Sequence, residues 1–78
     1  MIRLKIISPQ KEILSAEVER VELPGTLGRF EVLRNHAPLI SSLGNGVIRY
    51  VQDGQRQEIA CPGGFAEVSN NVVTVCIG

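Results

Sequence analysis

His36 is the only histidine in the chain, and a histidine is the side chain best suited to act as a general base near neutral pH. Nucleophilic catalysis through a histidine also needs a nucleophile and an orienting group close by. Ser41 and Ser42 are near in sequence, but they lie in a strand-like stretch without the strained turn that exposes a nucleophile. We therefore expect no catalytic residues and interpret His36 as a structural or interface residue.

Cys61 and Cys76 are the two cysteines, and with one distant histidine they fall short of the four ligands of a structural zinc site. We expect no metal site and interpret both cysteines as free thiols in a reducing compartment, with a disulfide as the alternative. The glycines are not followed by the glycine-lysine-serine or glycine-lysine-threonine sequence of a phosphate-binding loop. They indicate turns and bulges, so no cofactor is expected.

The length of 78 residues predicts a single domain over residues 1–78. Hydrophobic residues make up 44% of the chain but include only two Phe and one Tyr, so the core must be aliphatic. Eight basic and eight acidic residues balance without a basic patch, which argues against nucleic acid as a partner. No apolar run approaches the roughly 18 residues of a membrane span, and the N-terminus has a strand pattern rather than that of a signal peptide.

One stretch, residues 23–39, contains two glycines, two prolines and the histidine. Pro24-Gly25 is typical of a turn, and a short strand is predicted over Arg29–Leu33. Pro38 removes a backbone donor and favours extended geometry before it, so residues 34–39 should form a rigid loop. A rigid loop that mixes polar and apolar side chains suits docking to another protein, and a plain connection between two sheets is the alternative.

Alternating apolar residues predict further strands, and no stretch shows a sustained helical period. The expected strands are Ile2–Ser8, Glu12–Ala16, Glu17–Leu23 and Leu39–Leu43, with a bulge near Glu17-Val18. Short strands separated by turn signals indicate an all-β sandwich or barrel without a helical domain.

Two hairpins can be assigned a register from their turn residues. The turn Asp53-Gly54 places Ile48 opposite Ile59, Val47 opposite Ala60 and Arg49 opposite Glu58. The turn Asn70-Asn71 places Val68 opposite Val73, Ala66 opposite Val75 and Gly64 opposite Ile77. A slip of one residue in the second hairpin would bury Glu67, so its register is well specified.

Several motifs occur in an order and spacing that resemble a known family. They are Leu23-Pro24-Gly25, Gly28-x-Phe30-x-Val32-Leu33, Asn35-His36-Ala37-Pro38-Leu39, Gly46-Val47-Ile48-Arg49, residues 63–68 and residues 70–75. Together they resemble the N-terminal domain of the epsilon subunit of F-type ATP synthase. The resemblance implies a two-sheet β-sandwich of about ten short strands. It also implies a non-catalytic rotor subunit in the central stalk, which couples proton flow to ATP synthesis.

The resemblance further implies two partners, the gamma subunit and the ring of c subunits. The gamma-facing residues it implies are Ser8, His36, Ala37, Pro38, Leu39 and Ser41. The implied ring-facing loop is Thr26, Leu27, Gly28 and Arg29. Many family members have an acidic residue where this chain has Arg29, so the charge at the implied ring contact is reversed in this chain. The resemblance also implies an indirect membrane contact, at the cytoplasmic face of the bacterial inner membrane.

The family usually carries a pair of C-terminal helices that can block ATP hydrolysis and in some members bind ATP. The 78 residues contain no such segment, so we expect coupling without helix-driven inhibition and without ATP binding. A free-standing β-sandwich that binds a ligand such as a carbohydrate is the alternative. Such sites usually offer stacking aromatics, whereas this chain has only Phe30, Tyr50 and Phe65. An esterase-like hydrolase fails because no catalytic triad is evident.

Overall fold

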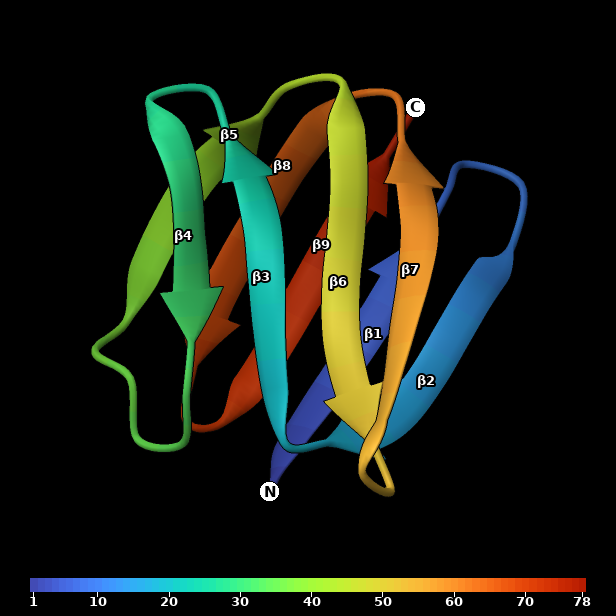
Figure 1. Ribbon diagram of the computed structural model, residues 1–78. Coiled ribbons are helices and arrows are strands. Elements are labelled where there is room, and N and C mark those ends of the chain that lie inside the picture. Colours follow the sequence, from blue (N-terminus) through green and yellow to red (C-terminus); the bar gives the residue numbers. More distant parts are fainter.

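The computed structural model describes residues 1–78 throughout, and its regular structure consists of nine β-strands (Figure 1). The strands are β1 (Ile2–Ile7), β2 (Glu12–Val18), β3 (Arg20–Gly25), β4 (Gly28–Val32), β5 (Leu39–Leu43), β6 (Gly46–Gln52), β7 (Gln55–Cys61), β8 (Gly64–Ser69) and β9 (Val72–Ile77). The expected all-β sandwich is therefore confirmed, with nine strands rather than ten. The structure has no helix of the length and apolar character needed to cross a membrane.

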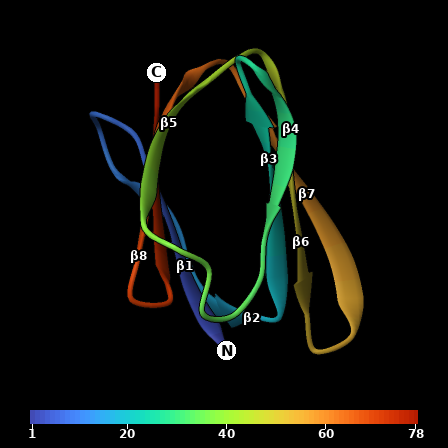
Figure 2. The ribbon, with the colours of Figure 1, turned by 90° about the vertical axis from the view of Figure 1, so that its left-hand side faces the viewer.

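The strands form two facing layers, which Figure 2 shows edge-on. The first layer has the order β2-β1-β9-β8-β5, and the second layer has β4 and β7 at its edges with β3 and β6 between them. The layers join at one corner, where Gly25 of β3 pairs with Leu43 of β5. They also join where the chain passes from β2 to β3, because the Glu19 N–H donates to the Val51 carbonyl at 2.8 Å. One curled path of hydrogen-bonded strands thus makes the sandwich.

The first layer is built around its first and last strands, which lie side by side. β1 pairs in parallel with β9, with Arg3 opposite Val72 and Ile7 opposite Cys76. β1 also pairs antiparallel with β2, and β9 with β8. The strand at the start of the chain therefore lies in the interior of the sheet, not at its edge.

Both predicted hairpin registers are confirmed. Ile48 pairs with Ile59 and Val68 pairs with Val73, and the neighbouring pairs follow as expected. The turn residues have the positive φ angles of mirror-image hairpin turns, 52° and 74° at Asp53 and Gly54 and 52° and 62° at Asn70 and Asn71. Asparagine, aspartate and glycine are the residues that tolerate this conformation, which is why the sequence specified these turns.

The predicted turn at Pro24-Gly25 is wrong, because both residues belong to β3 and the turn lies at Thr26-Leu27. Pro24 is buried, and its carbonyl accepts a hydrogen bond from Gly44 at 2.8 Å. Gly25 is required for close approach rather than for a positive φ. A Cβ atom there would lie 2.7 Å from the Gly28 carbonyl oxygen.

The predicted strand Glu17–Leu23 is confirmed over residues 20–23, where Val21 and Leu23 face the core, but its start is wrong and so is the bulge near Glu17-Val18. β2 continues through Val18, which is fully buried opposite Ile2, and β3 begins only at Arg20. Val18 and Val21 both face the core because they belong to two strands whose alternation changes phase at Glu19. The register shift that does occur between β1 and β2 lies between Ile6 and Ile7.

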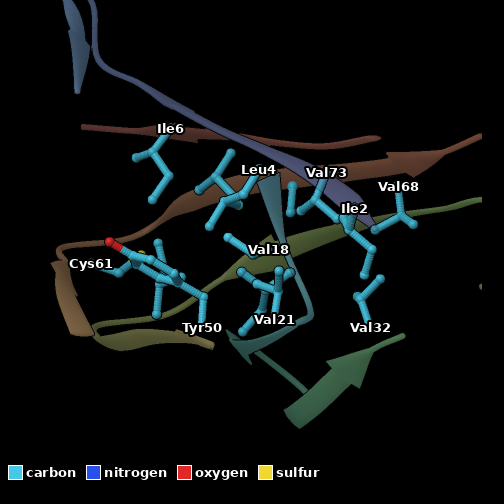
Figure 3. Packing of buried hydrophobic residues seen from close by; sticks show 14 of the residues in the cluster. Ile2, Leu4, Ile6, Val18, Val21, Val32, Tyr50, Cys61, Val68 and Val73 are labelled. Carbon is cyan, nitrogen blue, oxygen red and sulfur yellow. The ribbon is translucent and has the colours of Figure 1, made fainter. Parts of the chain in front are cut away.

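The core between the layers is aliphatic, as expected. Side chains from both layers point toward one another in Figure 3, and no polar or charged side chain is buried. The sixteen core residues are Ile2, Leu4, Ile6, Ala16, Val18, Val21, Leu23, Val32, Leu43, Ile48, Tyr50, Cys61, Ala66, Val68, Val73 and Val75. Burying each large aliphatic side chain contributes about 1.5–3 kcal/mol, so these contacts dominate the stability of so short a chain.

Candidate functional site

The loop between β4 and β5 holds the histidine in a defined conformation. The His36 N–H donates to the Leu33 carbonyl at 3.2 Å, which closes a turn with Asn35 at a φ of 64°. The ring Nδ1–H of His36 donates to the Ala37 carbonyl at 2.7 Å, since a carbonyl oxygen can only accept. In the neutral ring Nε2 is then the acceptor, and it makes no hydrogen bond within the chain. The loop between β4 and β5 thus has a hydrogen-bonded conformation of its own.

β5 presents alternate side chains to opposite sides of the first layer. Leu39 and Ser41 pair with Val68 and Ala66, which are buried, so they face the interior side. Ile40 pairs with Glu67 on the outer side and is 76% exposed. Two of the predicted gamma-facing residues, Leu39 and Ser41, are therefore half-buried on the inner side.

Ser8 lies far from the histidine loop. It belongs to the connection between β1 and β2, where its Oγ accepts a hydrogen bond from the Lys11 N–H at 3.3 Å. In Figure 1 this connection and the loop between β4 and β5 lie at diagonally opposite corners of the molecule. The predicted gamma-facing residues are thus not gathered into a single cluster.

Two exposed apolar side chains lie between these corners on the outer face of the first layer, which we define as the outward side chains of β1, β9, β8 and β5. Phe65 is 51% exposed and Ile40 is 76% exposed. The pairing of β8 with β9 and of β9 with β1 places Phe65 beside Cys76 and Cys76 beside Ile7. This row forms an apolar strip at the end of the outer face nearest the connection between β1 and β2. The next row along the strands contains Ile40, Glu67, Thr74 and Lys5, so it is mostly polar.

A shallow hollow lies at each end of this outer face. One, of about 320 Å³, is lined by residues that include Ile7, Ser8 and Phe65. The other, of about 300 Å³, is lined by Pro38, Leu39, Ile40, Glu67, Val68 and Ser69. Ser8 lines the first hollow, and Pro38 and Leu39 line the second, so each hollow contains residues that the resemblance implies at the gamma interface. The outer face therefore extends from the connection between β1 and β2 to the histidine loop.

Sequence reasoning missed Phe65 and Ile40 as surface residues. In β8 Phe65 alternates in phase with exposed Glu67 and out of phase with buried Ala66 and Val68. An aromatic residue in the polar phase of a strand was the available signal. Phe30 packs against the core and Tyr50 is buried, so Phe65 is the one aromatic side chain that is mostly exposed.

The predicted ring-facing loop is the turn between β3 and β4. Thr26 and Leu27 form the turn, and Leu27 is fully exposed at its tip. Gly28 has a φ of 130°, which favours glycine. Arg29 lies on the outer side of β4, where its Nε is 3.7 Å from a carboxylate oxygen of Glu22. The side chain of Arg29 therefore lies along the outer side of the second layer, beside Glu22 of β3.

The outer side of the second layer carries charges that pair with one another. Arg49 donates to Glu58 at 2.8 Å and lies 3.9 Å from Glu22, and this environment, with the Glu58 hydrogen bond foremost, raises the pKa of Arg49 above its ordinary value. Arg20 lies 3.8 Å from Glu31. These pairs are exposed and contribute little to stability individually, but they leave this side polar and nearly neutral.

The cysteines lie in different environments. Cys61 is fully buried in the core, Cys76 is half-buried on the outer face, and both are free thiols. No group of three or more histidine, cysteine, aspartate or glutamate side chains is placed to hold a metal ion.

The fold is that of a small β-sandwich domain found in a subunit of a larger complex. The family model described as the ATP synthase delta/epsilon chain β-sandwich domain matches residues 1–78. The chain therefore belongs to the ATP synthase delta/epsilon-chain β-sandwich family.

Curated relatives give the match more detail. The chain is 51% identical to the ATP synthase epsilon chain of Desulfitobacterium hafniense over 72 residues, which cover 92% of this chain and 54% of the relative. It is 45% identical to the ATP synthase epsilon chain of a Synechococcus strain over 76 residues, with 97% and 56% covered. The chain thus spans about half the length of the curated relatives it matches.

Solved structures agree with the fold. A chain of the Euglena gracilis mitochondrial ATP synthase, solved as OSCP, F1 and c-ring, matches with a TM-score of 0.90 and 25% identity, covering 97% of this chain and 49% of the other. A chain of the Tetrahymena thermophila mitochondrial ATP synthase central stalk and c-ring matches with a TM-score of 0.80. That second match has 13% identity and covers 97% of this chain and 62% of the other, so it supports the fold alone.

Proposed function

We propose that the chain acts as an epsilon-type subunit in the central stalk of an ATP synthase. It binds the gamma subunit and the c-ring and helps to transmit rotation between them, without catalysing a reaction itself. The observation that carries the proposal is the outer face, where exposed Phe65 lines one hollow with Ser8 and exposed Ile40 lines the other with Pro38. Exposed apolar surface of this kind marks protein interfaces.

The gamma subunit is the proposed occupant of the outer face. Phe65 and Ile40 supply apolar anchors, and Arg34 and His36 of the loop between β4 and β5 supply a polar rim at one end. Apolar anchors surrounded by polar contacts are the usual composition of a specific interface. The side chains of Leu39 and Ser41 face the inner side of β5 and support this surface from beneath, and Leu39 also lines the hollow beside Ile40.

The c-ring is the proposed partner of the turn at Thr26 and Leu27. The turn is a projecting tip in which Leu27 has its whole side chain exposed. Arg29 is already paired with Glu22 beside this tip. We propose that it affects c-ring binding through the charge of this pair rather than through a contact of its own.

A rotor element has to resist deformation, and the sandwich is suited to this. Its layers are hydrogen-bonded into one path of strands around a dry aliphatic core. Close-packed interiors have low compressibility and transmit strain. The chain would be attached only peripherally to the cytoplasmic face of a bacterial inner membrane, through the complex.

Titration calorimetry with the gamma subunit of the same organism tests this proposal. We expect saturable binding, and native mass spectrometry should show a complex of one copy of each chain. Absence of binding would contradict the assignment. Residues 1–78 should show no heat above dilution with millimolar ATP, because nucleotide binding is not part of the proposed role.

A carbohydrate-binding sandwich is the alternative from another class. Phe65 is the single mostly exposed aromatic side chain, and one ring is a small platform for stacking a sugar. Binding to gamma without binding to a glycan array would distinguish the two functions.

A further inference from the structure

Asn71 connects three segments of the chain at one end of the sandwich. Its backbone carbonyl accepts a hydrogen bond from the Arg3 N–H at 2.9 Å, which attaches the start of β1. Its side-chain Oδ1 accepts from the Asn35 N–H at 2.6 Å, and its Nδ2 donates to Asn35 Oδ1 at 3.2 Å. The turn between β8 and β9 is thereby tied both to the N-terminal strand and to the histidine loop.

Asparagine is suited to both positions of this pair. Asn35 and Asn71 have φ angles of 64° and 62°, a left-handed conformation that asparagine tolerates better than most residues. The amide group carries an acceptor and a donor, so Asn71 can use both toward Asn35 at once. Glycine would accept the φ angle but lacks the amide, and aspartate would lose the donor.

The Asn35–Asn71 pair is the main attachment of the loop between β4 and β5, which is otherwise connected to the sandwich only through the two strands that flank it. Residues 33–38 belong to no strand, and most of them are exposed. Apart from the Asn35–Asn71 pair, they are held by the His36 N–H bond to Leu33 and the His36 ring bond to Ala37, both of which lie inside the loop. The side-chain amide of Asn71 is thus what fixes the loop to the rest of the sandwich.

We infer that Asn35 and Asn71 are positioning residues, which hold the loop of His36, Ala37 and Pro38 in the orientation that the gamma subunit recognises. This inference rests on the proposed function. A loop fixed before binding loses less conformational entropy when the partner arrives, so the pair increases affinity without touching the partner.

The turn itself offers a matched control. Asn70 adjoins Asn71, has a φ of 52° and is exposed, and its side chain makes no hydrogen bond within the chain. Asn71→Gly removes the Asn35–Asn71 pair. Asn70→Gly removes an identical side chain from the adjacent position of the same turn and leaves the pair intact. Both substitutions keep a residue that favours a positive φ, so the hairpin is retained.

Amide hydrogen exchange and gamma binding together test the inference. In Asn71→Gly we expect exchange at the Asn35 N–H to accelerate at least about tenfold, the equivalent of about 1.4 kcal/mol. Affinity for gamma should fall at least about threefold, by slower association or faster dissociation. In Asn70→Gly both quantities should stay at their wild-type values.

Asn35→Gly provides a second variant. It keeps the backbone N–H that donates to Asn71 Oδ1 and removes only the Oδ1 acceptor, so its effects should be smaller than those of Asn71→Gly. Combining the two substitutions should add little to Asn71→Gly alone, because the pair is already lost.

The outcomes separate this inference from the proposed function. Equal exchange at Asn35 in the two turn variants, or faster exchange without weaker gamma binding, would overturn the positioning role. Failure of the unaltered chain to bind gamma would instead overturn the proposed function, and the exchange data would still show whether the pair fixes the loop.

Discussion

The hydroxyl oxygens of Thr26 and Ser42 lie 2.7 Å apart, so a hydrogen bond links the turn between β3 and β4 to β5 in the opposite layer. The Thr26 N–H also donates to the Ser42 carbonyl at 3.1 Å. The tip that carries Leu27 is therefore attached to both layers, although it projects into solvent.

Replacing Thr26 by valine removes the hydroxyl and keeps the branched shape of the side chain. We expect Thr26→Val to lower the free energy of unfolding by about 0.5–1.5 kcal/mol, the net contribution of one hydrogen bond. Chemical denaturation measures this value. Ser15→Ala is the control, because Ser15 is exposed and its side chain makes no hydrogen bond within the chain. A Thr26→Val value no larger than that of the control would show that the hydroxyl pair does not hold the tip.

Phe65→Asp places a charge in the apolar row of Phe65, Cys76 and Ile7 on the outer face. We expect affinity for gamma to fall at least about tenfold, or about 1.4 kcal/mol, because an unpaired carboxylate at the centre of an interface is not solvated. The melting temperature should change little, since Phe65 is 51% exposed. Gln55→Asp adds the same charge on β7 of the second layer and should leave gamma binding unchanged. Equal affinities for the two variants would place the interface elsewhere.

His36→Glu tests the loop at the end of the outer face, because His36 makes no hydrogen bond through its side chain except to Ala37. We expect weaker gamma binding with an unchanged fold. Leu39→Glu is a poorer test, since Leu39 packs against the core and its substitution should lower the free energy of unfolding by about 1.5–3 kcal/mol. Calorimetric titration and thermal melting distinguish the two effects. Wild-type affinity in His36→Glu would remove the histidine from the interface.

Arg29→Glu reverses the charge beside the proposed ring contact. The reversed side chain would face Glu22, which now lies 3.7 Å from Arg29, so the charge pattern beside the tip changes sign. We expect ATP-driven proton pumping by the reassembled complex to decrease, with a smaller decrease for Arg29→Gln. Arg56→Glu on β7 is the matched reversal and should have no effect. Pumping that is insensitive to all three changes would exclude a role for Arg29.

The two thiols should differ in accessibility. Cys76 is half-buried on the outer face and Cys61 is fully buried. Alkylation of the folded chain should therefore add one label, and alkylation in denaturant for the same time should add two. Intact-mass analysis without reductant reports the count. Zero labels under denaturing conditions would reveal a disulfide and contradict the free thiols. Bound gamma should also protect Cys76 from alkylation, because the thiol lies beside Phe65.

The hairpins could be predicted because their determinants are local. Asp53-Gly54 and Asn70-Asn71 favour tight turns wherever they occur, and the register then follows from the alternation of the flanking residues. The turn at Pro24-Gly25 could not be predicted correctly, because contacts distant in sequence decide it. Pro24 pairs with Arg29 of β4 and its carbonyl accepts a hydrogen bond from the Gly44 N–H, so pairing with later segments keeps Pro24 and Gly25 in a strand.

The candidate surface was only partly predictable for a similar reason. Motif positions identified the histidine loop and Ser8, but the sequence does not say that they lie at opposite corners of one sheet. It also does not show which side of β5 faces outward, since Leu39 and Ile40 are both apolar. Only the pairing of β5 with β8 decides that Ile40 is on the outer face.

The parallel pairing of β1 with β9 has a consequence for synthesis on the ribosome. The second layer and its hairpins are encoded by residues 20–61, so they can assemble while the chain is still emerging. β1 has only β2 beside it in the sheet until β9 has been made, since β9 supplies its other neighbour. The first layer therefore closes after the second, and the nascent chain should remain sensitive to proteases until β9 has emerged from the ribosome. Contacts between residues so distant in sequence also predict folding in milliseconds to seconds rather than microseconds.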